Sequence, residues 1–285
     1  MRSIPQKMKE TLVEATSDHA QSRLEGKVAV IFGAGGEVGA AVAREFASQG
    51  ARLFLSGRTG SRVRAMADGI SSDGRKIAAA ELNALDEDAV NRHLDEVVET
   101  AGRLDIVFNA TGPQPTEYGN GTSTMDLPLE QFMVPITSIV PSLFVTARSA
   151  ARHMARQGSG VLVFLSSTPS RGIAPGTSAI GAAFGAVESL TRSLAVDLGP
   201  HGVRVVCVRS MGMAETRTMQ QTYEIAGSTM GVPKEKMAEI VTSKALLGRS
   251  PSLEDTARLI SFLASDEARS ITGAIVNSSS GQVLD

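Results

Sequence analysis

The chain of 285 residues has few of the residue types that mark particular chemistries. Its single cysteine, Cys207, lies inside the apolar run 203–208, so we expect a buried thiol and no need for an oxidising compartment. Tryptophan is absent, and the histidines are scattered without the spacing of metal ligands, so we predict no metal site. The histidines are His19, His93, His153 and His201.

Runs of like charge and long apolar runs are also missing. A net charge of −2 without a basic run excludes an ordinary nucleic-acid partner. We find no segment that reads as membrane-spanning and no apolar signal core near the start, so we expect a soluble, cytoplasmic protein with no membrane partner. Residues 1–24 are polar, and we predict an N-terminal extension that is disordered or packed on a neighbouring subunit.

From residue 25 onward, short apolar runs alternate with helical patterns. This alternation predicts one α/β domain, residues 25–285, with a doubly wound parallel sheet of the Rossmann type in three αβα layers. The predicted strands are 28–32, 52–56, 76–82, 104–109, 161–165, 203–208 and 274–277. The predicted helices are 59–70, 86–100, 135–156, 176–198 and 253–264, with one more after the first strand. Ligands of such sheets bind beyond the carboxyl ends of the strands.

A glycine-rich motif, GAGGEVG, follows the first predicted strand and opens a helix at residues 33–39. Strand, tight glycine turn and helix in this order are typical of a dinucleotide-binding unit, in which backbone N–H groups receive a diphosphate. Glycines also end strands for conformational reasons alone. Glu37 argues against a nucleotide, because its carboxylate would lie close to the diphosphate. The expected contacts are Gly33, Gly35, Gly36, Val38 and Gly39.

Two stretches are longer than the connections of a compact domain require. Residues 113–127 are rich in glycine, proline and hydroxyl side chains, and residues 210–247 contain many methionines and threonines. We predict that both are substrate loops, with disorder as the alternative. Methionine side chains suit an apolar ligand pocket and core packing equally well.

Several segments resemble the short-chain dehydrogenase/reductase family, and the resemblance covers residues 25–285. They are GAGGEVG at 33–39, LDIVFNATG at 104–112, VLVFLSS at 161–167, ESLTRSLAVDLGPHGVRV at 188–205 and GRSPSLEDTARLISFLASDEARSITG at 248–273. The resemblance implies the fold predicted above and a nicotinamide dinucleotide laid across the strand ends. It also implies a homodimer or homotetramer, paired through the helices at 135–156 and 176–198.

The resemblance also suggests which cofactor is used. Arg58 follows the second strand, where no carboxylate stands to accept ribose hydroxyls, so NADP(H) is favoured over NAD(H). The alternative is a solvated surface arginine. Asn83 stands where the family has an aspartate near the adenine, and Asn109, Ala110 and Gly112 match the segment beside the adenosine ribose.

The family's catalytic residues are mostly replaced in this sequence. Ser167 matches the serine that orients the substrate carbonyl. The positions of the family's tyrosine, lysine and asparagine hold Ile180, Phe184 and Ile139. Because positioned acid–base catalysis contributes about 10²–10⁴ in rate, ordinary carbonyl reduction by the family mechanism is not expected. Tyr118 and Tyr223, one in each long stretch, and Arg171 beside Ser167 are possible substitutes; each is equally an ordinary loop residue.

These observations leave three functional hypotheses. The first is an NADP(H)-linked oxidoreductase that acts on a small apolar carbonyl, enone or imine and uses a non-standard proton donor. The second is a redox-inactive family member that serves as a binding or regulatory subunit. The third is a lyase, isomerase or cyclase that uses the same pocket without redox chemistry.

Overall fold

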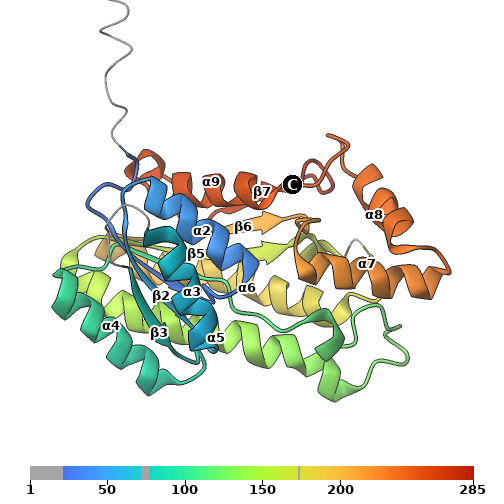
Figure 1. Cartoon of the computed structure of the whole chain (residues 1–285), viewed down its shortest axis with the longest axis horizontal. Helices are drawn as coiled ribbons and strands as arrows, with labels where there is room; N and C mark the ends of the chain where they lie inside the picture. The colour runs from blue at the N-terminus through green and yellow to red at the C-terminus, as the bar shows by residue number, and fades with distance from the viewer. Residues whose placement is uncertain (1–21, 72–76, 173) are drawn as a thin grey trace, which may run out of the picture.

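The computed structural model describes residues 22–71, 77–172 and 174–285, which fold around a sheet of seven parallel strands (Figure 1). The strand order is β3-β2-β1-β4-β5-β6-β7, so the chain winds outward in both directions from the centre of the sheet. This order confirms the doubly wound Rossmann-type fold. The strands are β1 (Val28–Phe32), β2 (Arg52–Gly57), β3 (Ala78–Glu81), β4 (Ile106–Asn109), β5 (Gly160–Ser167), β6 (Val203–Ser210) and β7 (Ile275–Ser278).

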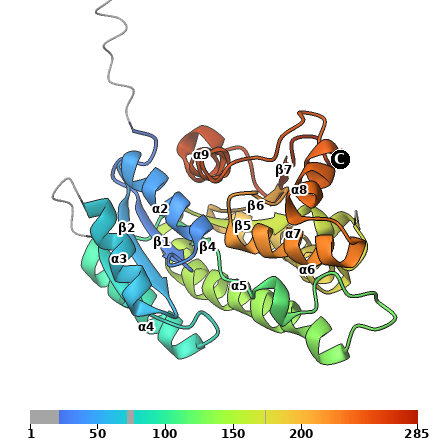
Figure 2. The ribbon, with the colours of Figure 1, turned by 45° about the vertical axis from the view of Figure 1, so that its right-hand side comes forward.

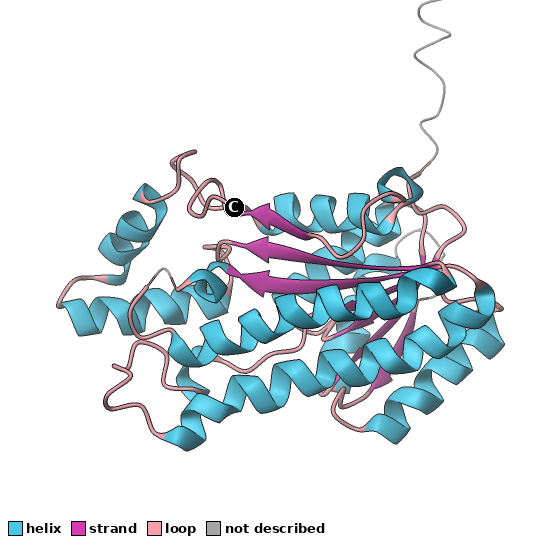
Figure 3. Cartoon of the chain, turned by 180° about the vertical axis from the view of Figure 1, so that it is seen from behind, coloured by secondary structure: helices cyan, strands magenta, loops and turns pink. Residues whose placement is uncertain are grey.

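Helices cover both faces of the sheet, which gives the three predicted layers (Figure 3). One layer contains α4 (Glu87–Ala101), α5 (Leu129–Gln157) and α6 (Ser178–Leu198). The other contains α2 (Glu37–Ser48), α3 (Gly60–Ile70) and α9 (Leu253–Ala264). Helices α7 (Arg217–Met230) and α8 (Lys234–Ser243) lie beyond the ends of β5 and β6 (Figure 2).

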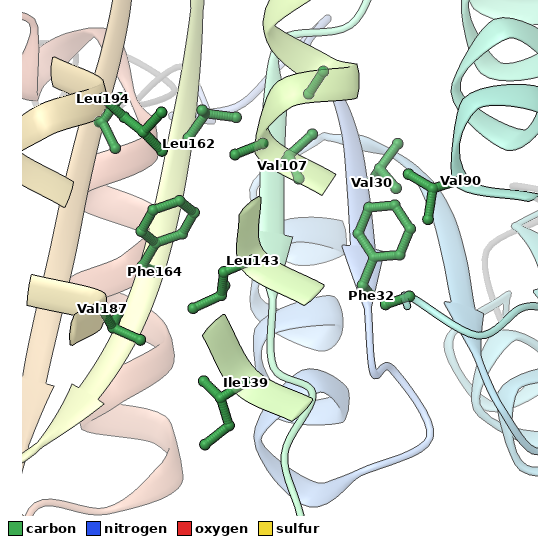
Figure 4. Packing of buried hydrophobic residues seen from close by; sticks show 14 of the residues in the cluster. Val30, Phe32, Val90, Val107, Ile139, Leu143, Leu162, Phe164, Val187 and Leu194 are labelled. Carbon is green, nitrogen blue, oxygen red and sulfur yellow. The ribbon is translucent and has the colours of Figure 1, made fainter. Parts of the chain in front are cut away.

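Each side of the sheet has its own apolar core, because successive strand side chains point to opposite faces. Val30 and Phe32 of β1 pack in the core beneath α4 and α5 (Figure 4). Ala29 and Ile31, between and beside them, belong to the core beneath α2 and α9. Every residue of β1 is buried, which explains why its sequence is a continuous apolar run rather than an alternating one.

Helix α5 departs from the prediction in two ways. It begins at Leu129, ahead of the predicted start at residue 135, and it contains Pro135 and Pro141. A proline removes one helical hydrogen bond, but the added turns bring further apolar side chains, including Phe132, onto the core. By length and composition α5 is also the one described helix that could cross a membrane, which corrects our expectation that no segment is long enough. Ile139, on the inner face of α5, is buried against the sheet. The cytoplasmic location of the protein stays a prediction.

The stretch 210–247 is not the irregular loop that its composition suggested. It contains α7 and α8, and α7 begins where the Thr216 side chain accepts a hydrogen bond from the N–H of Met219. The stretch 113–127 has only a short 3₁₀ turn, Pro115–Glu117, but it is anchored by a hydrogen bond from the N–H of Gly121 to the carbonyl of Gly176. Threonine is common both in loops and at the N-cap of a helix, which is the role of Thr216 here. The threonine content of 210–247 therefore could not distinguish a loop from the start of a helix.

The N-terminal boundary also needs correction. Leu24 is fully buried in the core beside α2, and its N–H donates to the carbonyl of Gln49. The domain therefore begins before residue 25. Residues 1–21 of the predicted extension lie outside the described residues.

Candidate functional site

The carboxyl ends of the strands border a cavity of about 950 Å³. It is lined by the glycine motif, by residues that follow β4, β5 and β6, and by α7 and α8. Both predicted substrate stretches contribute to the lining. Their apolar side chains in the lining include Met211, Met213, Met219, Met230, Met237, Ile240 and Val241.

The glycine motif forms a tight turn whose backbone is exposed to the cavity. Gly33 has φ +78°, and a Cβ there would lie 2.9 Å from the carbonyl carbon of Ala110. A Cβ on Gly39 would collide with the Gly33 carbonyl, which explains why α2 can press on the turn only with glycine at this position. The cavity lining includes Gly36, Val38 and Gly39.

The same turn leaves donors for an anion. Within the described residues, the N–H groups of Gly35, Glu37 and Val38 donate to no protein acceptor. Phe32, which replaces a polar residue of the family motif, does not enter this space, because it is buried edge-to-face against His93 with ring centroids 6.0 Å apart. The residues present therefore fit a diphosphate at the start of α2.

Glu37, the residue expected to oppose a diphosphate, contacts another helix. Its Oε2 accepts a hydrogen bond from the N–H of Arg217, the first residue of α7, at 2.8 Å. Glu37 is exposed, and both residues line the cavity. The carboxylate thus connects the glycine turn to the helix that covers the cavity.

Two of the residues predicted near the adenosine end, Arg58 and Asn83, lie outside the cavity lining. Arg58 is exposed directly after β2, and Asn83 is exposed with its Oδ1 accepting the N–H of Leu85 at 3.2 Å. The sequence argument missed Glu81, which ends the neighbouring strand β3 and whose carboxylate lies beside Gly60 at the start of α3. A carboxylate and a guanidinium therefore both stand at this edge of the sheet.

Asn109 is a structural clamp as well as a boundary of the cavity. Its amide donates to the Ser142 carbonyl at 3.2 Å and to Thr146 Oγ1 at 3.1 Å, and its Oδ1 accepts from the backbone N–H and the hydroxyl of Thr111. These bonds tie β4 to α5 and fully use the side chain. Ala110 and Gly112 line the cavity beside it, as the resemblance implied.

The four positions that the resemblance assigns to catalysis lie together in the cavity lining, and three of them hold apolar residues. Ser167, Ile139, Ile180 and Phe184 all belong to its lining. Ser167 Oγ donates to the carbonyl of Ser210 at 2.8 Å, and the isoleucines are buried. None of the three apolar side chains can hold or move a proton.

The proposed substitutes differ in their positions. Tyr118 is 5% exposed and lines the cavity, and its hydroxyl makes no hydrogen bond among the described residues. Burial raises the pKa of this phenol far above its usual value. Tyr223 is buried and Arg171 is exposed, and neither belongs to the cavity lining. The structure therefore brings only Tyr118 of the three to the same cavity as Ser167.

A buried ionic network that the sequence argument missed supports the strand ends behind Ser167. The Glu188 carboxylate accepts from Arg209 Nε at 2.8 Å and Nη2 at 2.7 Å, and from the hydroxyls of Ser166 and Ser170. Burial opposes ionisation of Glu188, but these hydrogen bonds, led by Arg209, outweigh it and lower its pKa. Arg209 also pairs with Asp285, which fixes the end of the chain. The signal in the sequence is an arginine near the carboxyl end of a mostly apolar strand.

Comparison with known proteins agrees with this fold. The profile described as enoyl-(acyl carrier protein) reductase matches residues 33–282. The chain is similar to a versicolorin reductase from Emericella nidulans, 29% identical over 91% of this chain and 96% of the relative. It is 31% identical to a short-chain dehydrogenase/reductase from Armillaria gallica, over 92% and 97% of the two chains.

A solved structure leads to the same assignment. The crystal structure of carveol dehydrogenase from Mycobacterium avium in complex with NAD superposes with a TM-score of 0.84 at 26% identity, over 93% of this chain and 100% of that one. The relatives are named reductases and dehydrogenases. The chain therefore belongs to the short-chain dehydrogenase/reductase family of oxidoreductases.

Proposed function

We propose that this protein uses NADP(H) to reduce an apolar carbonyl, enone or imine, with Tyr118 as the proton donor in place of the family's tyrosine. The observation that carries the proposal is the position of Tyr118, whose hydroxyl lacks a protein hydrogen bond in the described structure and whose side chain lines the cavity shared with Ser167. Because Tyr118 lines the cavity, its hydroxyl is available to donate a hydrogen bond to a substrate oxygen there.

The direction of the reaction follows from the protonation state of Tyr118. Burial raises its pKa, so the phenol stays protonated at physiological pH. A protonated phenol can donate to the alkoxide formed when a carbonyl is reduced, whereas alcohol oxidation would require a phenolate as the base.

The cofactor assignment depends on the glycine turn and on Arg58. The unpartnered N–H groups of Gly35, Glu37 and Val38 would hold the diphosphate, and Arg58 would pair with a 2′-phosphate. The bound nicotinamide would supply the hydride. The similar carveol dehydrogenase structure holds NAD, which supports a nicotinamide dinucleotide, and the preference for NADP(H) is supported only by Arg58 at the end of β2.

The substrate class follows from the lining of the cavity. The apolar lining includes Ile139, Ile180 and Phe184, together with methionines of the 210–247 stretch. Ser167 is the polar group that the family uses to orient a carbonyl; here a substrate oxygen would compete with the Ser210 carbonyl for its hydrogen. An apolar molecule with one polar oxygen fits this distribution.

The test is NADPH oxidation by the full chain across a panel of apolar ketones, enones and cyclic imines. We expect turnover with at least one ketone, loss of that turnover in Ser167→Ala, and a smaller rate with NADH. Saturable NADPH binding without turnover on any member of the panel would instead support the redox-inactive hypothesis. Turnover that persists after cofactor removal would support the lyase, isomerase or cyclase hypothesis.

The proposed assembly is a homodimer or homotetramer that pairs through α5 and α6. Phe144 on α5 and Val196 on α6 are 41% and 75% exposed, which supports an apolar contact surface on these helices. Light scattering of the purified chain should give a mass of two or four chains, and Val196→Lys should lower it.

A further inference from the structure

Glu37 makes a long-range contact that ordinary helix capping does not require. It is the first residue of α2, yet its carboxylate accepts the N–H of Arg217, 180 residues away, at 2.8 Å. Thr216 already caps the first turn of α7 through the N–H of Met219. The contact therefore adds a link between the glycine turn and α7, and both linked residues line the cavity.

This link lies where a negatively charged ligand would arrive. The first N–H groups of α2 face no protein acceptor in the described structure, and they form the diphosphate seat of the proposed function. The carboxylate of Glu37 projects from the same helix end. A diphosphate bound there would repel Glu37, because both groups carry negative charge and would lie a few Å apart. The repulsion between like charges is stronger where the protein displaces part of the surrounding water.

Arg217 would have a different relation to such a ligand. Its backbone N–H is bound by Glu37, while its guanidinium makes no hydrogen bond or ion pair among the described residues and belongs to the cavity lining. A guanidinium is the preferred partner of phosphate oxygens in proteins. Arg217 can therefore attract the ligand that Glu37 opposes.

We infer that Glu37 is a latch: in the cofactor-free protein it holds α7 against the glycine turn, and the cofactor diphosphate displaces it and pairs with Arg217. This inference rests on the proposed cofactor binding. It assigns to Glu37 the setting of cofactor affinity, and to Arg217 a contact with the phosphates. A purely structural role for Glu37 would require only the hydrogen bond and not the charge.

Four variants of the full chain separate charge from hydrogen bonding. Glu37→Gln keeps an acceptor for the Arg217 N–H but removes the charge, and Glu37→Ala removes both. Arg217→Ala removes the guanidinium and keeps the backbone N–H. Glu215→Gln is the matched control, because Glu215 makes the same kind of bond, to the N–H of Leu253 at the start of α9 at 2.7 Å, and lies outside the cavity lining.

Two measurements are needed: NADPH affinity by fluorescence titration, and hydrogen exchange of the α7 amides without cofactor. We expect Glu37→Gln and Glu37→Ala to tighten NADPH binding about tenfold, and Arg217→Ala to weaken it about tenfold. Exchange of the Arg217 amide should rise about tenfold in Glu37→Ala and stay unchanged in Glu37→Gln. Glu215→Gln should change neither measurement.

The outcomes distinguish this inference from the proposed function. If wild type binds NADPH saturably and Glu37→Gln binds with the same affinity, the latch is refuted and cofactor binding stands. If α7 exchange in Glu37→Ala equals that of wild type, the contact does not hold α7, and the latch is again refuted. If neither wild type nor any variant binds NADPH, the proposed function fails and the inference fails with it.

Discussion

Different physical constraints determine which residues stand at the two ends of the cavity, the glycine turn and the region around Ser167. At the glycine turn, the residue types are required by backbone geometry: Gly33 has a positive φ and Gly39 has no room for a Cβ. Near Ser167, Ile139, Ile180 and Phe184 stand where the resemblance places polar catalytic groups, and these apolar side chains pack against the core. The packing of the fold is thus compatible with apolar residues at these three positions.

The largest predicted effect tests whether the redox end has a replacement proton donor. We expect Tyr118→Phe to lower the rate of carbonyl reduction about 10²–10⁴-fold, the usual contribution of a positioned acid. Thermal stability should change little, because the removed hydroxyl has no protein partner in the described structure. Steady-state NADPH oxidation and a melting curve check this. Tyr223→Phe is the control, and equal rates for both variants would contradict the assignment.

The next effect tests the support behind the redox end. Glu188→Gln should destabilise the protein by about 3–5 kcal/mol, because it leaves the buried Arg209 without its bidentate partner. Equilibrium denaturation measures this loss. The control is Glu239→Gln, which breaks an exposed pair with Lys236 and should leave the stability nearly unchanged. Similar losses for the two variants would show that the network does not act as a buried pair.

The same carboxylate predicts a dependence on acid. The pKa of Glu188 is lowered in the folded state, so its stabilisation is complete above the unfolded pKa of about 4.3 and is lost as the pH falls through the folded pKa. Wild type should therefore lose more stability than Glu188→Gln between pH 5 and the acid limit of folding. Parallel curves for the two proteins would contradict this.

A smaller effect tests cofactor choice at the adenosine end. Arg58→Ala should weaken NADPH binding about tenfold and leave NADH binding unchanged, because one charged contact to the 2′-phosphate is removed. Glu81→Gln should act in the opposite direction, since its carboxylate stands at the neighbouring strand end. Titration with both cofactors measures the ratio, and Arg92→Ala on α4 is an exposed control. Equal losses for NADPH and NADH in Arg58→Ala would remove the basis for the NADP(H) preference.

The smallest effect tests the packing beneath the glycine turn. Burial lowers the pKa of His93, although nearby Glu96 raises it, and His93 Nε2 has no hydrogen-bond partner within the part of the chain that the structure describes. Because the neutral ring is favoured in the fold, stability should fall as the pH drops below 6.5 and level off below the folded pKa. His93→Leu should reduce this slope between pH 7 and pH 5 in denaturation experiments. An unchanged slope would place the titrating group elsewhere.

Much of the fold could be predicted because its signals are local. The apolar run of β1, the glycines of its turn and the alternation of strands and helices each follow from short-range geometry. The predicted start of α5 was wrong, and the two helices within 210–247 were not predicted. Pro135 and the threonine-rich segment are each compatible with both a helix and a loop. In α5 the outcome depends on how its apolar face meets the core.

The sequence by itself determined the layered α/β fold and the glycine turn, because both depend on residue type and spacing. Only the tertiary structure decided that Tyr118 rather than Tyr223 or Arg171 lines the cavity, that Glu37 binds α7, and that Glu188 pairs with Arg209. These contacts join residues far apart in the chain. Their existence depends on where packed helices and strand ends bring side chains together, and no local pattern records that.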